Sequence, residues 1–554
     1  NEKSDPNVDA SIYPSTPTIS PEDLDKIFHY YQTLAPDALP AQNRKYPIAK
    51  DNGLFQLNHQ NGMFPAVGNM PMTTFVSMVP GKNEIIMGSF GEKGNLASFS
   101  TNGTRNWSQD FPSAPTWVDF SNPNQWLVTC IGSVQPTNAK IGSIHNFSPQ
   151  SKSSSVVASE VARPVMSFRL PQSNQILINA FGHLKGQTYT YNTNKKSQEQ
   201  VLRDIPGAIC SRIADWDGDG KKDILTLFAQ NKESIVFFKN TGSGYQETAT
   251  LLETMPVYGS NSFDLADMNG DGKLDIIYTC GDNADYSVIL KDYHGVYVYL
   301  NQGNNQVKQG YFYPIHGCFK ALARDFDLDG DQDIITVSFF ADFLSQHEEA
   351  AVYLENNKMD FKPFALPGYD IGRWLTMDAA DVDGDGDQDL VFGNLSMGPE
   401  SFMSQEQVKK FASGPACIFL KIPLANPKSM KKLVTALKYF INLFWGIIFL
   451  LFASVQFNDP DPVIWIFAYT LTAVLCFTYL KSTWAIKLKW LYLLVGLAML
   501  VGSVIQFPPH WEGFGTEMKT ANNELARESI GLLLCGLVLL VQFFCIKPKT
   551  TVKR

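Results

Sequence analysis

The chain has 554 residues, with 45 Lys and Arg against 54 Asp and Glu, so its formal net charge is −9. Residues 425–554 hold 13 Lys and Arg against 6 Asp and Glu, a net charge of +7, which leaves −16 for residues 1–424 and indicates at least two different domains. The acidic front part argues against nucleic-acid binding, and eight widely spaced cysteines without a CxxC pair argue against a disulfide scaffold or a structural zinc site.

The first predicted element is an amphipathic helix, at about residues 20–35, within an N-terminal extension of residues 1–50. Ser20 supplies a cap and Pro21 occupies the first turn, a pattern typical of a helix start. One face carries Leu24, Ile27, Phe28, Tyr31 and Leu34. A single short helix is not stable alone, so we expect it to dock on another part of the protein. The chain begins with Asn1 and no Met, which favours a removed leader or an upstream segment.

Four segments of the front part share one pattern. They read DWDGDGKKD (215–223), DMNGDGKLD (267–275), DFDLDGDQD (325–333) and DVDGDGDQD (381–389), and an apolar run follows each. Oxygens at positions 1, 3, 5 and 9 and a carbonyl at position 7 are suited to one hard cation, and the Gly at position 6 permits the tight turn. Six to eight oxygen ligands favour calcium over magnesium.

Two other interpretations of these loops are weaker. An EF-hand needs Glu at position 12 and a following helix, whereas position 12 here is occupied by Thr226, Tyr278, Thr336 and Phe392. Solvated Asp- and Gly-rich turns are an ordinary alternative for one copy. Four copies in one register, with 17 aspartates, favour metal binding because bound cations would relieve the repulsion.

The repeat extends upstream without the carboxylates. Similar turn-then-apolar units begin at Ile85, Trp126 and Ile176, so seven units recur at intervals of roughly 50 residues. Such a pattern predicts an all-β propeller of seven blades over residues 51–424. We expect the first three units to bind no metal.

These loops and their spacing resemble the FG-GAP/VCBS repeat family, the calcium-loop propellers of integrin heads. The resemblance implies up to four calcium ions, which stabilise blades and perform no chemistry. It implies these side-chain ligands: Asp215, Asp217, Asp219, Asp223, Asp267, Asn269, Asp271, Asp275, Asp325, Asp327, Asp329, Asp333, Asp381, Asp383, Asp385 and Asp389. Backbone carbonyls would come from Lys221, Lys273, Asp331 and Asp387.

A linker at 425–435 leads into an apolar C-terminal domain, residues 436–554. Its apolar runs are Leu433–Phe457, Val463–Leu480, Trp490–Phe507 and Ser529–Ile546, each near the ~20 residues that span a bilayer. They predict an all-α bundle of four transmembrane helices, with the lipid bilayer as a partner. The stretches VQFNDPDPVIWIFAYTLTAVL (455–475) and NELARESIGLL (523–533) resemble the transmembrane protein 220 family, which implies a fold but no activity.

Polar residues between these runs form a candidate site at one membrane face. They are Gln456, Asn458, Asp459, Asp461, Glu524, Arg527 and Glu528. Such charges can pair or hold a cation. The alternative is helix capping, because Asp459 and Asp461 precede a helix start.

Two arguments about sidedness conflict. With four spans, the propeller side holds ten Lys and Arg of the flanking segments and the other side only Lys519 and Arg527, which favours a cytoplasmic propeller. Calcium sites of ~10⁻⁴–10⁻³ M fill only outside the cytosol, and large domains are translocated regardless of charge. We therefore expect a multi-pass protein of the inner or plasma membrane with an extracytoplasmic propeller.

Three functions fit this sequence. The first is a calcium-stabilised binding or assembly module whose propeller face binds a protein or a glycan. The second is an accessory subunit of an electron-transfer system, because PTISPEDLDKIFHYYQTLAPDALPAQ (17–42) resembles the tail of a cytochrome-c-like segment, although no CxxCH is present. The third is a propeller enzyme acting on glycans. No HExxH, GxSxG or Walker motif occurs, which favours a binding role over an enzyme and leaves this third function open.

Overall fold

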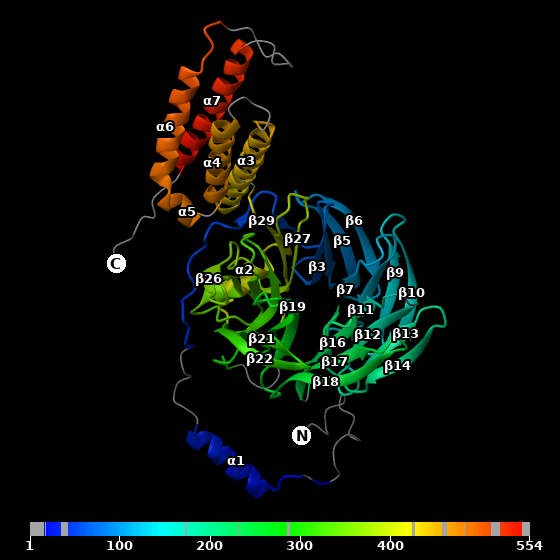
Figure 1. Ribbon diagram of the computed structural model, residues 1–554. Coiled ribbons are helices and arrows are strands. Elements are labelled where there is room, and N and C mark those ends of the chain that lie inside the picture. Colours follow the sequence, from blue (N-terminus) through cyan, green and yellow to red (C-terminus); the bar gives the residue numbers. More distant parts are fainter. Residues whose placement is uncertain are drawn as a thin grey trace. The chain divides into compact units, whose positions relative to one another are not determined.

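The structure, a computed structural model, describes residues 16, 18–34, 42–171, 174–230, 232–284, 289–400, 402–423, 427–456, 462–480, 482–510 and 521–545. The chain forms two compact units, Asn1–Leu424 and Ala425–Arg554. The first unit is a ring of seven antiparallel sheets, as Figure 1 shows, and the prediction of a seven-bladed propeller is confirmed.

Blades 1 to 6 are each a sheet of four strands taken in order, and blade 7 has three such strands and two short ones from the N-terminal segment. Blades 1 to 3 contain β3 (Thr73–Val79), β4 (Glu84–Ser89), β5 (Gly94–Ser100), β6 (Arg105–Phe111), β7 (Pro115–Asp119), β8 (Trp126–Cys130), β9 (Gly142–Ser148), β10 (Ser153–Val161), β11 (Pro164–Arg169), β12 (Gln175–Ala180), β13 (Gln187–Asn192) and β14 (Ser197–Arg203). Blades 4 to 6 contain β15 (Ala208–Ala214), β16 (Asp223–Phe228), β17 (Glu233–Asn240), β18 (Tyr245–Thr254), β19 (Ser260–Ala266), β20 (Asp275–Cys280), β21 (Gly295–Gly303), β22 (Gln306–Pro314), β23 (Cys318–Arg324), β24 (Asp333–Ser338), β25 (Ala351–Glu355) and β26 (Lys362–Ala365). Blade 7 contains β27 (Trp374–Ala380), β28 (Asp389–Asn394), β29 (Cys417–Lys421), β1 (Gln56–Leu57) and β2 (Met63–Phe64).

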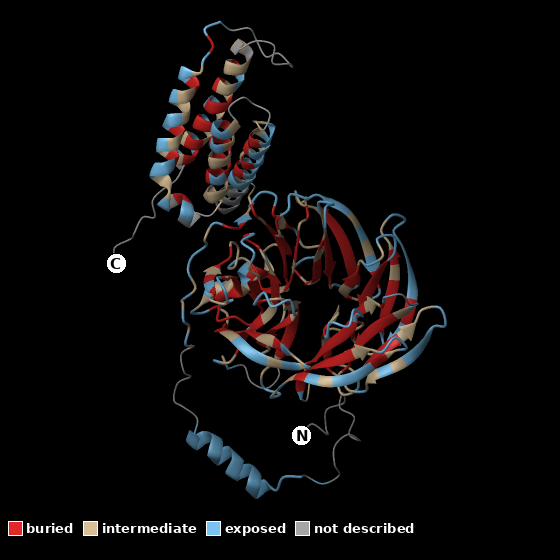
Figure 2. Cartoon of the chain, viewed as in Figure 1, coloured by how far each residue is buried: buried red, intermediate tan, exposed pale blue. Residues whose placement is uncertain are grey.

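The apolar runs of the repeat become the second strand of each blade. Ile85, Trp126 and Ile176 lie on β4, β8 and β12, and the runs after the four Asp-rich loops form β16, β20, β24 and β28. These four strands are buried along their whole length, because neighbouring blades cover both faces. Figure 2 shows this burial, with exposed residues concentrated on the outer strands.

The ring closes through the N-terminal segment. β29 pairs with β28 on one side and with β1 and β2 on the other, in the register Gln56↔Lys421 and Met63↔Ile418. Carboxylates on inner strands also join blades: Asp378 accepts the backbone N–H of Met78 at 2.9 Å, which connects blade 7 to blade 1. Asp119 and Asp264 accept a backbone N–H of the next blade in the same way.

The N-terminal helix is present as α1 (Pro21–Leu34), close to the predicted bounds, and Ser20 Oγ accepts the N–H of Asp23. All residues of α1 are exposed, so the expected docking of its apolar face does not occur among the described residues. Residues 42–57 instead pack on the propeller, where Ala49 bridges to Phe364 of blade 6. Blade 7 also carries α2 (Gln405–Ala412), which starts at a Ser404 capping box, and blade 6 a short 3₁₀ helix, His347–Ala350.

The second unit contains α3 (Pro427–Val455), α4 (Pro462–Tyr479), α5 (Ser482–Lys487), α6 (Lys489–Ile505) and α7 (Ala521–Cys545). The predicted linker is mostly helical, because its residues 427–435 continue into α3. The described residues of this unit form five helices where the sequence predicted four, because α5 is too short and polar to show as an apolar run. Two segments, Lys438–Val455 and Pro462–Tyr479, meet the length and hydropathy of a membrane span, while α6 is a shorter apolar helix.

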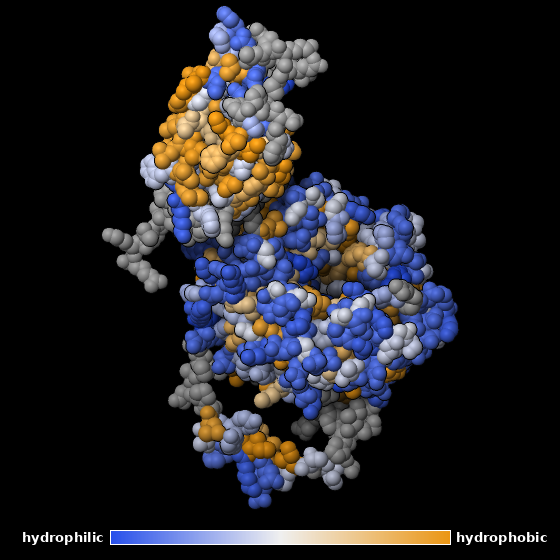
Figure 3. Space-filling view, viewed as in Figure 1, coloured by the Kyte–Doolittle hydropathy of each residue, from blue (hydrophilic) through white to orange (hydrophobic). Residues whose placement is uncertain are grey.

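The surface of these helices suits lipid better than water. Only 22% and 39% of the two spans are buried within the unit. Phe440, Val463, Phe467 and Val504 are each between 67% and 77% exposed. A soluble protein would bury such side chains, so this apolar surface, orange in Figure 3, supports membrane association.

Candidate metal centres

The four Asp-rich loops occupy one structural position, between the first and second strands of blades 4 to 7. Their position-6 glycines, Gly220, Gly272, Gly330 and Gly386, have φ between +84° and +97°. This conformation lets the N–H of position 6 reach the first Asp: Gly220 donates to Asp215 Oδ2 at 2.9 Å, and the three other loops repeat the bond. The backbone thus has the same tight turn in all four loops.

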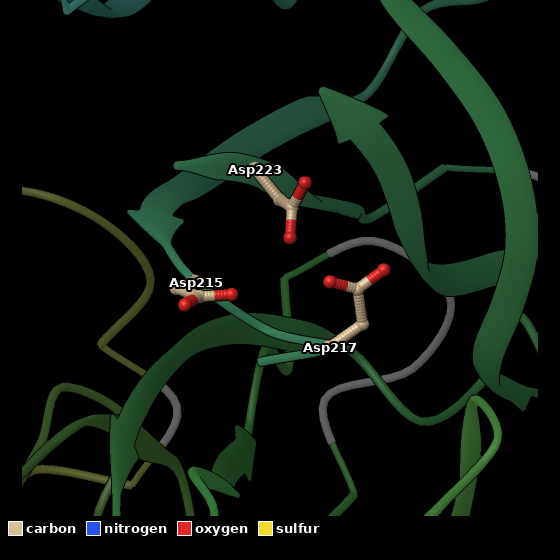
Figure 4. A group of neighbouring side chains, drawn as sticks. All are labelled: Asp215, Asp217 and Asp223. Atoms are coloured by element: carbon tan, nitrogen blue, oxygen red, sulfur yellow. The ribbon is translucent and has the colours of Figure 1, made fainter. Parts of the chain in front are cut away.

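Three of the loops bring carboxylates together. In the first, ligand oxygens of Asp215, Asp217 and Asp223 lie within 4.8 Å of one another, and Figure 4 shows their side chains converging. The third loop gathers Asp325, Asp327 and Asp333, and the fourth Asp381, Asp383 and Asp385. Hard oxygen ligands at this separation are the kind that calcium takes.

The carboxylate at position 9 is the most buried part of each loop. Asp223, Asp275, Asp333 and Asp389 are all 0% exposed. The first three accept two backbone N–H groups, one from position 2 of the loop and one from an Asn at or near the end of the third strand. Asp333, for example, accepts the N–H of Phe326 at 3.2 Å and that of Asn356 at 2.7 Å. Position 9 therefore ties the loop to the blade.

The fourth loop contains acceptors that a cation would satisfy. Both oxygens of Asp389 and Oδ1 of Asp387 are buried without a hydrogen-bond partner among the described residues. In the first loop, Asp215 Oδ1 is also buried without one. Buried carboxylate oxygens without a donor are costly, so the residues present fit a bound cation.

The electrostatics of the loops agree with this fit. Burial raises the pKa of Asp333 to about 7 and that of Asp389 to about 8, and the neighbouring aspartates of each loop add to the increase. Burial also raises the pKa values of Asp223 and Asp275. A divalent ion would reverse the effect, because it favours the ionised carboxylates.

Two lysines that the sequence analysis did not single out contact the loops. Lys239 on β17 pairs with Asp217 and lies 2.9 Å from Asp219 Oδ2, and Lys421 on β29 pairs with Asp383 and lies 3.5 Å from Asp385 Oδ2. The ammonium of Lys239 donates hydrogen bonds to the carboxylates of Asp217 and Asp219, and these bonds hold the pKa of Lys239 above its usual value. Both lysines lie near the end of the third strand of their blade. Their shared position in the repeat is the sequence feature that could have identified them.

Other predicted ligands lie outside the three carboxylate groups. In the second loop Asn269 replaces an Asp, and its Oδ1 accepts the N–H of Asp271 at 2.9 Å. Asp219 and Asp329 accept backbone N–H groups of their own loops. The assigned carbonyls of Lys221, Lys273, Asp331 and Asp387 remain predictions; the side chain of Asp331 accepts the N–H of Lys358.

The candidate polar site at the membrane face is only partly described. Asn458, Asp459 and Asp461 lie outside the described residues. Oε1 of Gln456 is buried without a hydrogen-bond partner in the described part of the chain. Glu524, Arg527 and Glu528 lie in the first turns of α7, so this site remains a prediction.

One buried pair of the propeller resembles acid–base machinery. His316 Nδ1 lies 3.0 Å from Glu349 Oε2, and Arg44 of the N-terminal segment also pairs with Glu349. Glu349 is 0% exposed, and burial lowers the pKa of His316 to about 4. The contact between Arg44 and Glu349 anchors residues 42–57 to blade 6.

Comparison with known families agrees with this geometry. A family model described as FG-GAP-like repeat matches residues 189–278 and 325–392. The chain carries FG-GAP-like repeats. A second model, transmembrane family 220, helix, matches residues 448–544, so the propeller is followed by a helix domain of that type. No curated protein matches the chain.

Solved structures show only distant likeness. Hydrazine synthase of Kuenenia stuttgartiensis is 9% identical with a TM-score of 0.39, over 60% of this chain and 94% of that one. A putative 6-phosphogluconolactonase of Bacteroides fragilis is 12% identical with a TM-score of 0.40, over 57% and 95%. The periplasmic gluconolactonase of Pseudomonas aeruginosa is 12% identical with a TM-score of 0.38, over 63% and 88%. Likeness at this level carries no argument about function.

Proposed function

We propose that this membrane-associated propeller is stabilised by calcium and serves as an extracytoplasmic module that binds or assembles another protein or a glycan. The observation that supports it best is that carboxylates converge in the loops of blades 4, 6 and 7, and that Asp389 is buried without a donor among the described residues. Backbone N–H bonds to position 9 couple the first three loops to their blades. A cation held there would stabilise the scaffold and leave the propeller faces free for a partner.

The binding role is tested in the membrane that contains the protein. Cross-linking of the full chain in membranes, followed by native electrophoresis, should give an assembly larger than the chain alone. Removing calcium with EDTA before cross-linking should reduce it, because the propeller would lose its order. Migration as the single chain under both conditions would contradict a role in assembly.

The extracytoplasmic location is supported by the calcium argument, since weak calcium sites fill where calcium is abundant. A protease added to intact cells or spheroplasts should digest residues 1–424. Protection until the membrane is lysed would show that the flanking lysines had predicted the orientation correctly and that the propeller is cytoplasmic.

A further inference from the structure

A groove of about 390 Å³ runs along the surface of the second unit between α3 and α7. Lys438, Ile441 and Trp445 line it from α3, at the spacing of one helix face. Leu534, Leu537 and Val538 line it from α7. From Lys438 to Trp445 the groove extends about 10 Å along the helix axis.

One end of the groove is polar. Asn442 and Gln542 line it there, and they are only 6% and 4% exposed. Asn442 Nδ2 donates to the carbonyl of Lys438 at 2.6 Å, which directs its Oδ1 toward Gln542 Nε2. The amide of Gln542 is thereby oriented, and its Oε1 is buried without a donor among the described residues. Amide side chains commonly link membrane helices in this way, so it is this Oε1 of Gln542, without a partner in the described part of the chain, that offers an acceptor to a ligand at this end.

The same end carries a cation. Lys438 is exposed, and none of the acidic side chains that the structure describes forms an ion pair with it. A lysine at the end of an apolar span extends to the headgroup region of a bilayer, where it attracts anionic lipids.

The opposite end is apolar and open to the side. Trp445 and Leu534 line this end. Along the rim of the whole groove, Ile441, Leu537 and Val541 are 43%, 47% and 62% exposed. This rim belongs to the apolar surface that we assign to lipid. The groove therefore changes from charged to apolar along its length, as an amphiphile does.

We infer that this groove binds one anionic phospholipid, with the phosphate at Lys438, the polar headgroup near Asn442 and Gln542, and an acyl chain along Trp445, Leu534 and Leu537. A free anion would meet the lysine alone and gain nothing from the apolar walls. A zwitterionic lipid would place its own cation near Lys438. The site is independent of the calcium loops.

The test uses the purified full chain in detergent with equal amounts of phosphatidylglycerol and phosphatidylcholine, and native mass spectrometry to count retained lipids. The wild type should retain one phosphatidylglycerol in preference to phosphatidylcholine. Lys438→Gln should lower that preference about fivefold, the effect of one cation near a headgroup. Lys487→Gln, an exposed cation on α5 outside the groove, should leave it unchanged.

A second variant tests the groove itself. Gln542→Leu should also lower retention, with helix content checked by circular dichroism, because the polar end would lose its amide. Equal retention of both lipids by the wild type would overturn the proposal, because the groove would then show no preference for an anionic lipid. An equal loss in Lys438→Gln and Lys487→Gln would contradict it too, because retention would then depend on overall charge and not on the groove. Unchanged preference in Lys438→Gln would also overturn it.

Discussion

The position-6 glycines of the loops show how single residues set the shape of the metal centres. Gly220 has φ +84°, and an added Cβ would meet nothing within 4 Å, so replacement by Ala tests the backbone alone. Gly220→Ala should lower the free energy of unfolding by about 1 kcal/mol and weaken calcium binding, because a Cβ disfavours this conformation.

A matched control is Gly68→Ala. Gly68 also has open space around its Cβ position, but its φ lies outside the left-handed region. Denaturant unfolding should therefore show a loss for Gly220→Ala and almost none for Gly68→Ala. Equal effects would mean that the loop conformation is not what the glycine provides.

A buried carboxyl outside the loops should make stability depend on pH. Glu233 is 2% exposed and accepts hydrogen bonds from Ser260, and burial raises its pKa to about 7. Between its ordinary pKa of 4.5 and 7, the folded protein binds a proton that the unfolded chain lacks. Stability should therefore fall by about 3 kcal/mol as pH rises through this window.

Unfolding measured at saturating calcium from pH 4.5 to 8 tests this dependence. Bound calcium keeps the loop carboxylates ionised, so that their titration does not obscure that of Glu233. Glu233→Gln should have a smaller slope, because it carries no titrating proton. If the free energy of unfolding of Glu233→Gln changed with pH in the same way as that of the wild type, groups other than Glu233 would cause the pH dependence.

At the scale of elements, the end of the third strand contributes a lysine to two of the loops. Lys239 and Lys421 place an ammonium against the carboxylates of the first and fourth loops. A cation there competes with calcium, so Lys239→Met should raise the affinity of the first loop severalfold, as measured by calorimetric titration. An affinity that falls would mean that the lysine orders the empty loop more than it repels the ion.

The N-terminal segment is a second element whose role can be measured. Arg44 pairs with Glu349, whose side chain is 0% exposed, whereas Lys45 pairs with Asp360 at a site where both side chains are 45–67% exposed. Arg44→Ala should cost about 3 kcal/mol because it leaves a buried charge without its cation. Lys45→Ala should cost less than about 1 kcal/mol. Similar losses in denaturant unfolding would contradict a specific anchor at Glu349.

The sequence predicted elements best where the signal is local. The apolar runs after the loops correctly placed β16, β20, β24 and β28, and the carboxylate spacing identified the loops themselves. The sequence did not predict the pairing of Gln56 with Lys421, because that contact joins distant parts of the chain and neither strand has a residue pattern that indicates its partner. Lys239 was missed for the same reason, since it reaches Asp217 only through the sheet.

At the scale of the whole molecule, the change in charge and hydropathy near residue 425 lies at the boundary between the two compact units, Asn1–Leu424 and Ala425–Arg554. The number of membrane spans is less evident. α6 is 17 residues long, and whether it spans alone depends on the bilayer around it, which no residue pattern contains. The four-span topology therefore remains our prediction.

The central claim, that calcium stabilises the propeller, is tested by thermal unfolding of the full chain in detergent with 1 mM calcium and with EDTA. At a Kd of ~10⁻⁴ M, each filled site adds about 1.4 kcal/mol, so the melting temperature should be several degrees higher with calcium. Asp385→Ala should narrow the difference, whereas Asn124→Ala, in a turn of blade 2 without the Asp-rich motif, should not. Identical melting temperatures with calcium and with EDTA would contradict the claim.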